Sequence, residues 1–181
     1  AEEPRQEMTV KDLLRETTLR LRSAGIEDPR VDSEILLAAT LQVPRAHLPA
    51  IDTLSIKDQC HFEEWIRERS EKRTPVAHLI GEWEFFGLPF RVSPDVLIPR
   101  PETEFLVERA LTRKERTFLD IGTGSGAIAV ALATKGFSGI ATDTSTEALH
   151  IARENAERNG VSSRIKFVEA DLFAPGNYDL V

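Results

Sequence analysis

Residues 119–133, with the sequence LDIGTGSGAIAVALA, are the part of the chain best suited to bind a small ligand. An apolar stretch runs into an acid, Asp120, and an alanine-rich segment follows a run of alternating glycines, Gly122, Gly124 and Gly126. Glycine-rich turns between a strand and a helix bring backbone N–H groups close to a ligand, and the helix N-terminus favours negative charge. With Gly122, Gly124 and Ala127 read as its three small residues, the turn also matches a dinucleotide fingerprint.

The charge of Asp120 separates the ligands that such a turn can hold. Asp143 lies 21 residues after Gly122, close to the spacing of a ribose-binding acid. Two like charges about 4 Å apart repel by roughly 4 kcal/mol at an effective dielectric of 20, so a pyrophosphate would be repelled by Asp120. S-adenosylmethionine has no phosphate, and its ammonium and sulfonium groups would be attracted. The sequence therefore predicts a site for S-adenosyl-L-methionine.

Each part of that cofactor is assigned to particular residues. We expect the loop N–H groups to favour its carboxylate, Asp143 to accept from the ribose hydroxyls, Asp171 to accept from the adenine amino group, and Leu172 or Phe173 to cover the ring. The predicted cofactor-binding residues are Asp120, Gly122, Thr123, Gly124, Ser125, Gly126, Asp143, Asp171 and Leu172. No metal-binding residues are predicted.

Strands and helices alternate through the second half of the chain. Strands are predicted at 116–120, 138–143, 164–171 and from 178, with helices from about 125 to 135 and from 144 to 159. This alternation indicates a parallel sheet, in which ligands bind at the carboxyl ends of the strands. Asp120, Asp143 and Asp171 are therefore expected to line one crevice.

The first half of the chain has the periodicity of a small helical bundle. Helices are predicted over 9–25, 28–42 and 55–73, with Thr9 and Ser55 as N-caps. The third helix contains Cys60, which we expect to be packed in the core. The predicted domains are a helical substrate-recognition domain at 1–75, a β-hairpin linker at 76–95 and a cofactor-binding domain at 96–181. A bundle of this kind is either a purely structural unit or a module that recognises a partner.

The segment VSPDVLIPRPETEFLVERAL leads from the hairpin to the glycine turn. Pro99 and Pro101 hold the backbone extended, because each proline disfavours helical geometry in the residue before it. A helix is then predicted with an apolar stripe of Phe105, Leu106, Val107 and Ala110. Rigid presentation of charged side chains suits a pocket wall, and the predicted wall is Arg100, Pro101, Glu102 and Thr103.

Composition excludes several classes of protein. The formal charge of −7 argues against sequence-independent nucleic-acid binding, which needs a basic face. One cysteine allows no internal disulfide. No apolar run reaches the roughly 20 residues that a membrane span requires. The opening AEEPRQE resembles no signal or transit peptide, so we expect a cytoplasmic protein. We also expect the parent enzyme to be a monomer.

The motifs LIPRPETE at 97–104, LDIGTGSGAIAVAL and ATDTSTEALHIARENAERNG resemble the HemK/PrmC family of protein-(glutamine-N5) methyltransferases. The resemblance covers nearly the whole chain. It implies a partial Rossmann-like class I methyltransferase sheet, preceded by the helical bundle and the hairpin. It also implies methylation of the glutamine in the Gly-Gly-Gln motif of class I peptide chain release factors, with the helical domain helping to dock that protein.

The family's catalytic motif, Asn-Pro-Pro-Tyr, is expected just after Val181, so no catalytic residue is assigned and we expect the 181-residue polypeptide alone to be inactive. Its Asn side chain and Pro carbonyl would orient the substrate amide nitrogen for attack. Two other functions stay open: an amino-methyltransferase of the same fold that acts on nucleic-acid bases or another protein, and an NAD-dependent oxidoreductase.

Overall fold

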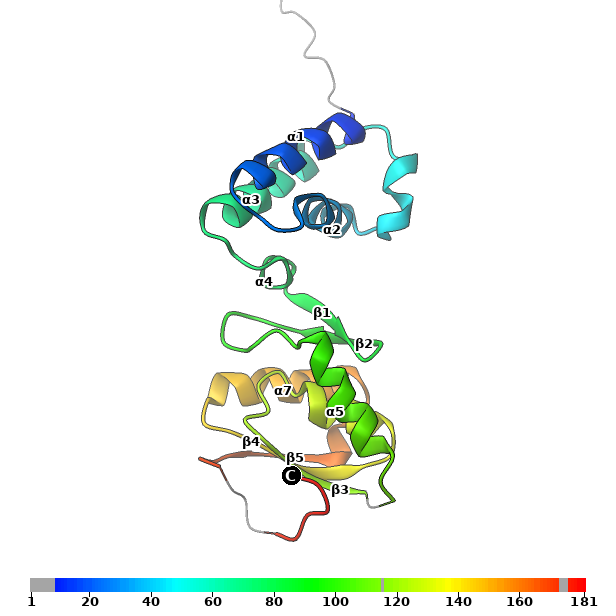
Figure 1. The fold of residues 1–181 in the computed structure, drawn as a ribbon, viewed down its shortest axis with the longest axis vertical. Helices are drawn as coiled ribbons and strands as arrows, with labels where there is room; N and C mark the ends of the chain where they lie inside the picture. Colours follow the sequence, from blue (N-terminus) through cyan, green and yellow to red (C-terminus); the bar gives the residue numbers. More distant parts are fainter. Residues whose placement is uncertain (1–8, 115, 173–175) are drawn as a thin grey trace, which may run out of the picture. The chain divides into compact units, whose positions relative to one another are not determined.

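The computed structural model describes residues 9–114, 116–172 and 176–181. These residues form two compact units, one ending at Ile80 and one beginning at Gly81 (Figure 1). The hairpin that we expected as a separate linker lies within the second unit. The opening residues, on which the expectation about signal and transit peptides rests, lie outside the described part.

The first unit is helical. It contains α1 (Val10–Ser23), α2 (Pro29–Leu41), the 3₁₀ helix η1 (Arg45–Ala50), α3 (Ile56–Glu71) and α4 (Val76–Ile80). The two predicted N-caps are confirmed: the hydroxyl of Thr9 accepts the backbone N–H of Asp12, and that of Ser55 accepts the N–H of Asp58. The apolar faces of the helices meet in one core, which includes Val10, Leu13, Leu21, Leu36, Leu37, Leu48, Phe62 and Ile66.

Two expectations for this unit are wrong. Cys60 is exposed, because it lies on the side of α3 away from the buried Phe62 and Ile66. The hairpin linker was expected to begin at residue 76, but residues Val76–Ile80 form a short helix and the first strand begins at Glu82. Pro75 begins this turn, since its carbonyl accepts from the backbone N–H groups of His78 and Leu79.

The second unit starts with an antiparallel hairpin. Strands β1 (Glu82–Phe85) and β2 (Leu88–Arg91) pair with Trp83 opposite Phe90. Phe85 and Phe90 are buried, and their rings meet edge to face with centroids 6.0 Å apart. Gly87 lies in the turn between the two strands, with a φ of +71°.

A parallel sheet follows, built from β3 (Thr117–Ile121), β4 (Ser138–Asp143) and β5 (Ile165–Glu169) in the order β3-β4-β5. Near the chain end, Leu180 makes a parallel bridge to Phe118, so β3 has neighbours on both sides. The backbone N–H of Leu119 donates to the carbonyl of Leu180 at 2.9 Å. The direction of chain progression therefore reverses at β3, and ligands of open α/β sheets bind at such a switch point.

Helices cover this sheet. They are α5 (Pro101–Leu111), α6 (Ala127–Thr134) and α7 (Thr146–Arg158), with the 3₁₀ helix η2 (Ser162–Arg164) before β5. α6 packs against all three strands, and its alanines let it approach closely. Figure 1 shows α5 and α7 on the same side of the sheet.

The apolar stripe predicted for α5 is only partly correct. Val107 is fully buried against the core, and Ala110 packs against it, but Phe105 and Leu106 are 66% and 59% exposed. Successive helical residues are rotated by about 100°, so Phe105, Leu106 and Val107 cannot all face the same neighbour.

Candidate functional site

The glycine turn joins β3 to α6 at the carboxyl edge of the sheet. Its three glycines, Gly122, Gly124 and Gly126, have φ angles of +69°, +55° and +79°. Three backbone N–H groups of the turn have protein acceptors: Thr123 donates to the carbonyl of Thr142 at 2.9 Å, Gly124 donates to Asp143 at 2.9 Å, and Gly126 donates to the carbonyl of Thr123 at 2.8 Å. The turn is thus fixed by hydrogen bonds to β4 and to itself.

Asp143 is the last residue of β4 and holds two segments with one carboxylate. Its Oδ2 accepts the N–H of Gly124, and its Oδ1 accepts the N–H of Ser145 at 3.0 Å. Ser145 in turn is the N-cap of α7, and its hydroxyl accepts the N–H of Ala148 at 3.1 Å. Each carboxylate oxygen of Asp143 has a second lone pair for another donor.

Asp120 lies beneath the turn, one residue before the end of β3. Its Oδ2 accepts the hydroxyl of Thr123 at 2.7 Å. Burial raises the pKa of the Asp120 carboxyl, and the nearby charge of Asp143 adds to the rise, whereas the Thr123 hydroxyl and the backbone N–H of Ala129 oppose it. Ala129 is in the first turn of α6, whose N-cap Gly126 offers no side chain, so the carboxylate lies at the positive end of that helix.

The three glycines of the turn differ in what surrounds them. A Cβ on Gly122 or Gly124 would meet nothing within 4 Å, so both residues border open space. A Cβ on Gly126 would lie 3.0 Å from the Cβ of Ala152 on α7, so this glycine lets two helices approach. The open backbone of the first two, beside the acidic groups of Asp120 and Asp143, fits a ligand that carries positive charge and no phosphate.

Asp171 and Leu172 follow β5, the next strand along the same edge. Both are exposed, and Leu172 has a φ of +72°, which is rare for a residue with a branched side chain. Such strain is frequent at ligand sites. In the described part of the chain no hydrogen bond or ion pair joins either residue to Asp120, Asp143 or the turn. Phe173, the other residue predicted to cover the ring, lies outside the described residues.

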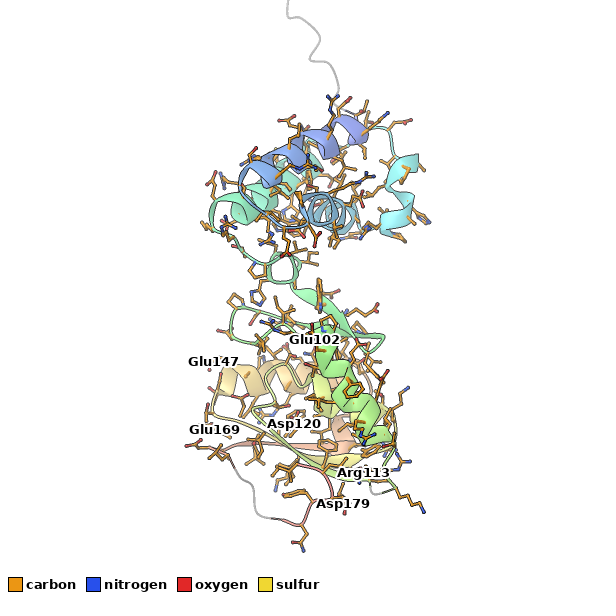
Figure 2. All side chains as sticks on the ribbon, in the orientation of Figure 1. Glu102, Arg113, Asp120, Glu147, Glu169 and Asp179 are labelled. Atoms are coloured by element: carbon orange, nitrogen blue, oxygen red, sulfur yellow. The ribbon has the colours of Figure 1, made fainter. Side chains whose placement is uncertain are left out.

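The predicted wall lies at the start of α5. Arg100 is the N-cap in extended conformation, Pro101 is the first helical residue, and the backbone N–H of Thr103 donates to the carbonyl of Arg100 at 3.0 Å. Among the described residues, no hydrogen bond or ion pair connects the wall to the glycine turn. In Figure 2, Glu102 lies at one end of α5, while Asp120, Glu147 and Glu169 lie toward one edge of the sheet, away from Arg113 and Asp179.

The contact that holds α5 to the hairpin was not predicted from the sequence. Glu104 accepts the backbone N–H of Phe86 at 2.9 Å, which ties the first turn of α5 to the turn between β1 and β2. Arg158 on α7 forms an ion pair with Glu82 at 2.8 Å. An acid in the first turn of a helix can have many partners, so only the structure could assign this one.

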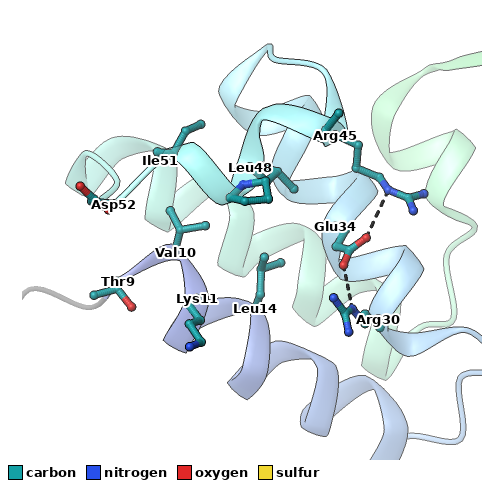
Figure 3. A pocket seen from close by; sticks show the side chains of 12 residues that line it. Thr9, Val10, Lys11, Leu14, Arg30, Glu34, Arg45, Leu48, Ile51 and Asp52 are labelled. Carbon is teal, nitrogen blue, oxygen red and sulfur yellow. Dashed lines mark hydrogen bonds and ion pairs between the residues drawn. The ribbon is translucent and has the colours of Figure 1, made fainter.

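A hollow lies in the helical unit (Figure 3). It measures about 850 Å³ and is lined by α1, the start of α2 and the 3₁₀ helix. Apolar side chains form its floor, including Val10, Leu14, Leu48 and Ile51. At its rim Glu34 accepts a hydrogen bond from Nε of Arg30 at 2.8 Å and forms an ion pair with Arg45 at 3.2 Å. We call this hollow the helical groove. The i,i+4 spacing of Arg30 and Glu34 was visible in the sequence, but the contribution of Arg45 was not.

Within the described residues, no group of three or more His, Cys, Asp or Glu side chains is arranged to hold a metal ion. In the same residues, no helix has the length and apolar character needed to cross a membrane.

Both units match known families. Residues 12–81 match the model of the PrmC N-terminal domain, and residues 105–181 match that of the ribosomal protein L11 methyltransferase PrmA. A release factor glutamine methyltransferase from Nitratidesulfovibrio vulgaris is 40% identical over 95% of this chain and 62% of its own length. One from Cereibacter sphaeroides is 42% identical over 96% of this chain and 64% of its own. Over the residues matched, the chain is similar to release factor glutamine methyltransferases, and its first unit matches the PrmC N-terminal domain.

This similarity confirms the resemblance found in the sequence. The chain spans less than two thirds of the length of these PrmC relatives. Among solved structures, a tRNA (uracil-54, C5)-methyltransferase from Pyrococcus abyssi, in complex with S-adenosyl-L-homocysteine, matches 55% of this chain and 26% of its own. Its TM-score is 0.48 and its identity 21%, a likeness too partial to bear on function.

Proposed function

We propose that the protein methylates the side-chain amide nitrogen of the glutamine in the Gly-Gly-Gln motif of class I peptide chain release factors, with S-adenosyl-L-methionine as methyl donor. The observation that carries this proposal is the 40–42% identity, over nearly the whole chain, to release factor glutamine methyltransferases. The glycine turn with its two acids supports the choice of cofactor.

The chain's own residues suit the cofactor without rearrangement. Gly122 and Gly124 present backbone with open space before it, and the N-terminus of α6 favours a carboxylate there. Asp143 keeps a free lone pair on each oxygen for the ribose hydroxyls. A positive charge near Asp120 would offset the cost of burying its carboxylate.

The neighbouring segments complete the proposed site. Asp171 accepts from the adenine amino group, and the exposed side chain of Leu172 covers the ring. The exposed residues at the start of α5 form a wall of the glutamine pocket, with Arg100 and Glu102 presented by the flanking prolines. We assign no base to Glu102.

Bound at this site, S-adenosylmethionine supplies a methyl group on a positively charged sulfur. An amide nitrogen is a poor nucleophile, since its lone pair is delocalised into the carbonyl. It must therefore be held in line by acceptors for its two N–H bonds. In this family those acceptors belong to an Asn-Pro-Pro-Tyr motif expected after Val181. Accordingly, no residue among those described is assigned the catalytic role.

The helical groove is our proposed contact for the protein substrate. Its apolar floor of Val10, Leu14, Leu48 and Ile51 can hold apolar side chains of the release factor. Glu34 binds Arg30 and Arg45 through their Nε atoms. The remaining guanidinium N–H groups can then bind carboxylates of the partner.

A methylation assay on the full-length protein tests the proposal. A purified class I release factor, ribosomal protein L11 and double-stranded DNA are each incubated with the enzyme and radiolabelled S-adenosylmethionine. We expect label in the release factor alone. L11 is the second candidate, because residues 105–181 match the L11 methyltransferase model. Label in L11 or DNA, with none in the release factor, would refute the proposed substrate while leaving the cofactor assignment intact.

A further inference from the structure

Asn155, three residues before the end of α7, is fully buried, and its side-chain amide joins three segments of the second unit. Its Nδ2 donates to the carbonyl of Ser125 in the glycine turn at 2.9 Å and to the carbonyl of Arg91 in β2, also at 2.9 Å. Its Oδ1 accepts the backbone N–H of Arg91 at 2.7 Å. Both amide protons are therefore used, one on the turn and one on the hairpin.

The bonds to Arg91 resemble those of a neighbouring strand. Asn155 pairs with both the N–H and the carbonyl of Arg91, which lie on the edge of β2 away from β1. One turn further along α7, Asn159 donates to the carbonyl of Pro89 on the same edge at 3.1 Å. Two asparagines of one helix thus cover the outer edge of the hairpin, but only Asn155 reaches the glycine turn.

The bond to Ser125 acts at the point where the turn becomes α6. Ser125 is 3% exposed. The next residue, Gly126, has a left-handed backbone, and a Cβ added to it would lie 3.0 Å from the Cβ of Ala152. A buried carbonyl without a donor costs about 1–3 kcal/mol. Loss of the amide donor would therefore favour other orientations of the Ser125–Gly126 peptide. The turn would then spend less time in the conformation in which Gly124 donates to Asp143.

We infer that Asn155 is a positioning residue, which holds the glycine turn in its ligand-binding conformation and ties it to the hairpin strand that leads into the 97–104 segment. This inference rests on the proposed function for the identity of the ligand, but the geometry it concerns exists without one. A turn that spends less time in the competent conformation binds its ligand more weakly in proportion to that loss.

Asn155→Asp is the decisive variant. It preserves size and the oxygen that accepts from Arg91, and it replaces the nitrogen that donates to the carbonyls of Ser125 and Arg91 with an oxygen. Asn159→Asp, at the C-cap of α7, is the matched control: the same substitution and the same charge, with loss of the bonds to the carbonyls of Pro89 and Asn155 but of none to the turn. Both are made in the full-length protein, and thermal unfolding shows that each is folded.

The first measurement is amide hydrogen exchange without any ligand. The N–H groups of Thr123, Gly124 and Gly126 have named acceptors and report directly on the turn. We expect their exchange to be faster in Asn155→Asp by about three- to tenfold than in Asn159→Asp or the wild type, which corresponds to loss of one hydrogen bond. Equal exchange at these three amides in both variants would overturn the inference.

The second measurement is calorimetric titration with S-adenosylhomocysteine. We expect a dissociation constant about three- to tenfold higher for Asn155→Asp than for Asn159→Asp. In turnover assays the KM for S-adenosylmethionine should rise more than kcat falls. If the wild type does not bind S-adenosylhomocysteine, the proposed cofactor fails, and the exchange experiment still decides the role of Asn155. If the wild type binds it and both variants bind it equally, the inference is wrong.

Discussion

Gly124 and Asp143 lie 19 residues apart in sequence, and the backbone N–H of Gly124 donates to Oδ2 of Asp143 at 2.9 Å. The acid at the end of one strand thereby holds the turn that follows the neighbouring strand. This contact gives Asp143 a part in shaping the apo turn in addition to its proposed contact with ribose.

Replacing Asp143 with alanine should weaken the binding of S-adenosylhomocysteine by roughly 1.5–3 kcal/mol, the usual value of hydrogen bonds to a charged group. Calorimetry on the full-length protein measures the effect. The control is Glu108→Ala, which removes an exposed carboxylate from α5. An unchanged dissociation constant in Asp143→Ala would remove Asp143 from the site.

Asp120 should make stability depend on pH. Its pKa is raised in the folded protein, chiefly by burial. Below the ordinary carboxyl pKa of 3.8 both folded and unfolded states hold the proton. As pH rises from there to the raised pKa, only the unfolded state has ionised, so folding is progressively disfavoured; above the raised pKa the penalty is constant.

Asp120→Asn removes this penalty and retains one oxygen for the Thr123 hydroxyl. We expect its free energy of unfolding to exceed that of the wild type by more at pH 7 than at pH 4, and its affinity for the cationic S-adenosylmethionine to be lower. Urea unfolding across that range checks the first expectation, with Glu108→Gln as control. A stability difference that does not change with pH would show that Asp120 is not the titrating group.

Two glycine substitutions should separate stability from binding. Gly126→Ala combines a φ of +79° with a Cβ 3.0 Å from that of Ala152, and it should destabilise the fold by more than the roughly 1–2 kcal/mol of left-handed backbone alone. Gly160→Ala, with a φ of +69° and open space, is its control. Similar losses in melting experiments would show that α6 and α7 adjust easily.

Gly124→Ala should behave in the opposite way. Its Cβ would enter space that is open in the protein and that we assign to the cofactor. We expect a stability loss no greater than that of Gly160→Ala but a clear loss of affinity for S-adenosylhomocysteine. Unaltered affinity would place the cofactor elsewhere.

Charge reversal in the helical groove should damage docking alone. Arg30→Glu together with Arg45→Glu should reduce methylation of intact release factor, but spare cofactor affinity and methylation of a short Gly-Gly-Gln peptide. Arg15→Glu together with Arg22→Glu, on the exposed face of α1, is the matched control. If peptide and protein methylation fall equally, the groove has no part in docking.

Local patterns predicted the elements well. The caps Thr9 and Ser55 each have a short side-chain oxygen before a helical period, and the structure confirms both. The alternation of strand and helix predicted the parallel sheet, because each element needs only its own period to be recognised. The bridge at Leu180 agrees with the strand predicted from residue 178.

Contacts between distant residues could not be predicted in this way. Phe105 and Leu106 were predicted to belong to a buried stripe, but of the three consecutive apolar residues only Val107 faces the core. Which side of α5 is buried depends on how the helix packs against the hairpin and α6. Asn155 is one polar residue among many on α7, and nothing in its neighbourhood distinguishes it from Asn159. Its part in the site depends on where Ser125 and Arg91 lie in space.

The most direct test of the account is a comparison of backbone amide NMR spectra of the full-length protein with and without S-adenosylhomocysteine. We predict that saturable shifts concentrate at residues 122–126, at Asp143 and at residues 171–172, and that NADH causes none there. Shifts confined to other parts of the protein, or shifts in this turn with NADH and not with S-adenosylhomocysteine, would contradict the assignment of the glycine turn as the methyl donor's site.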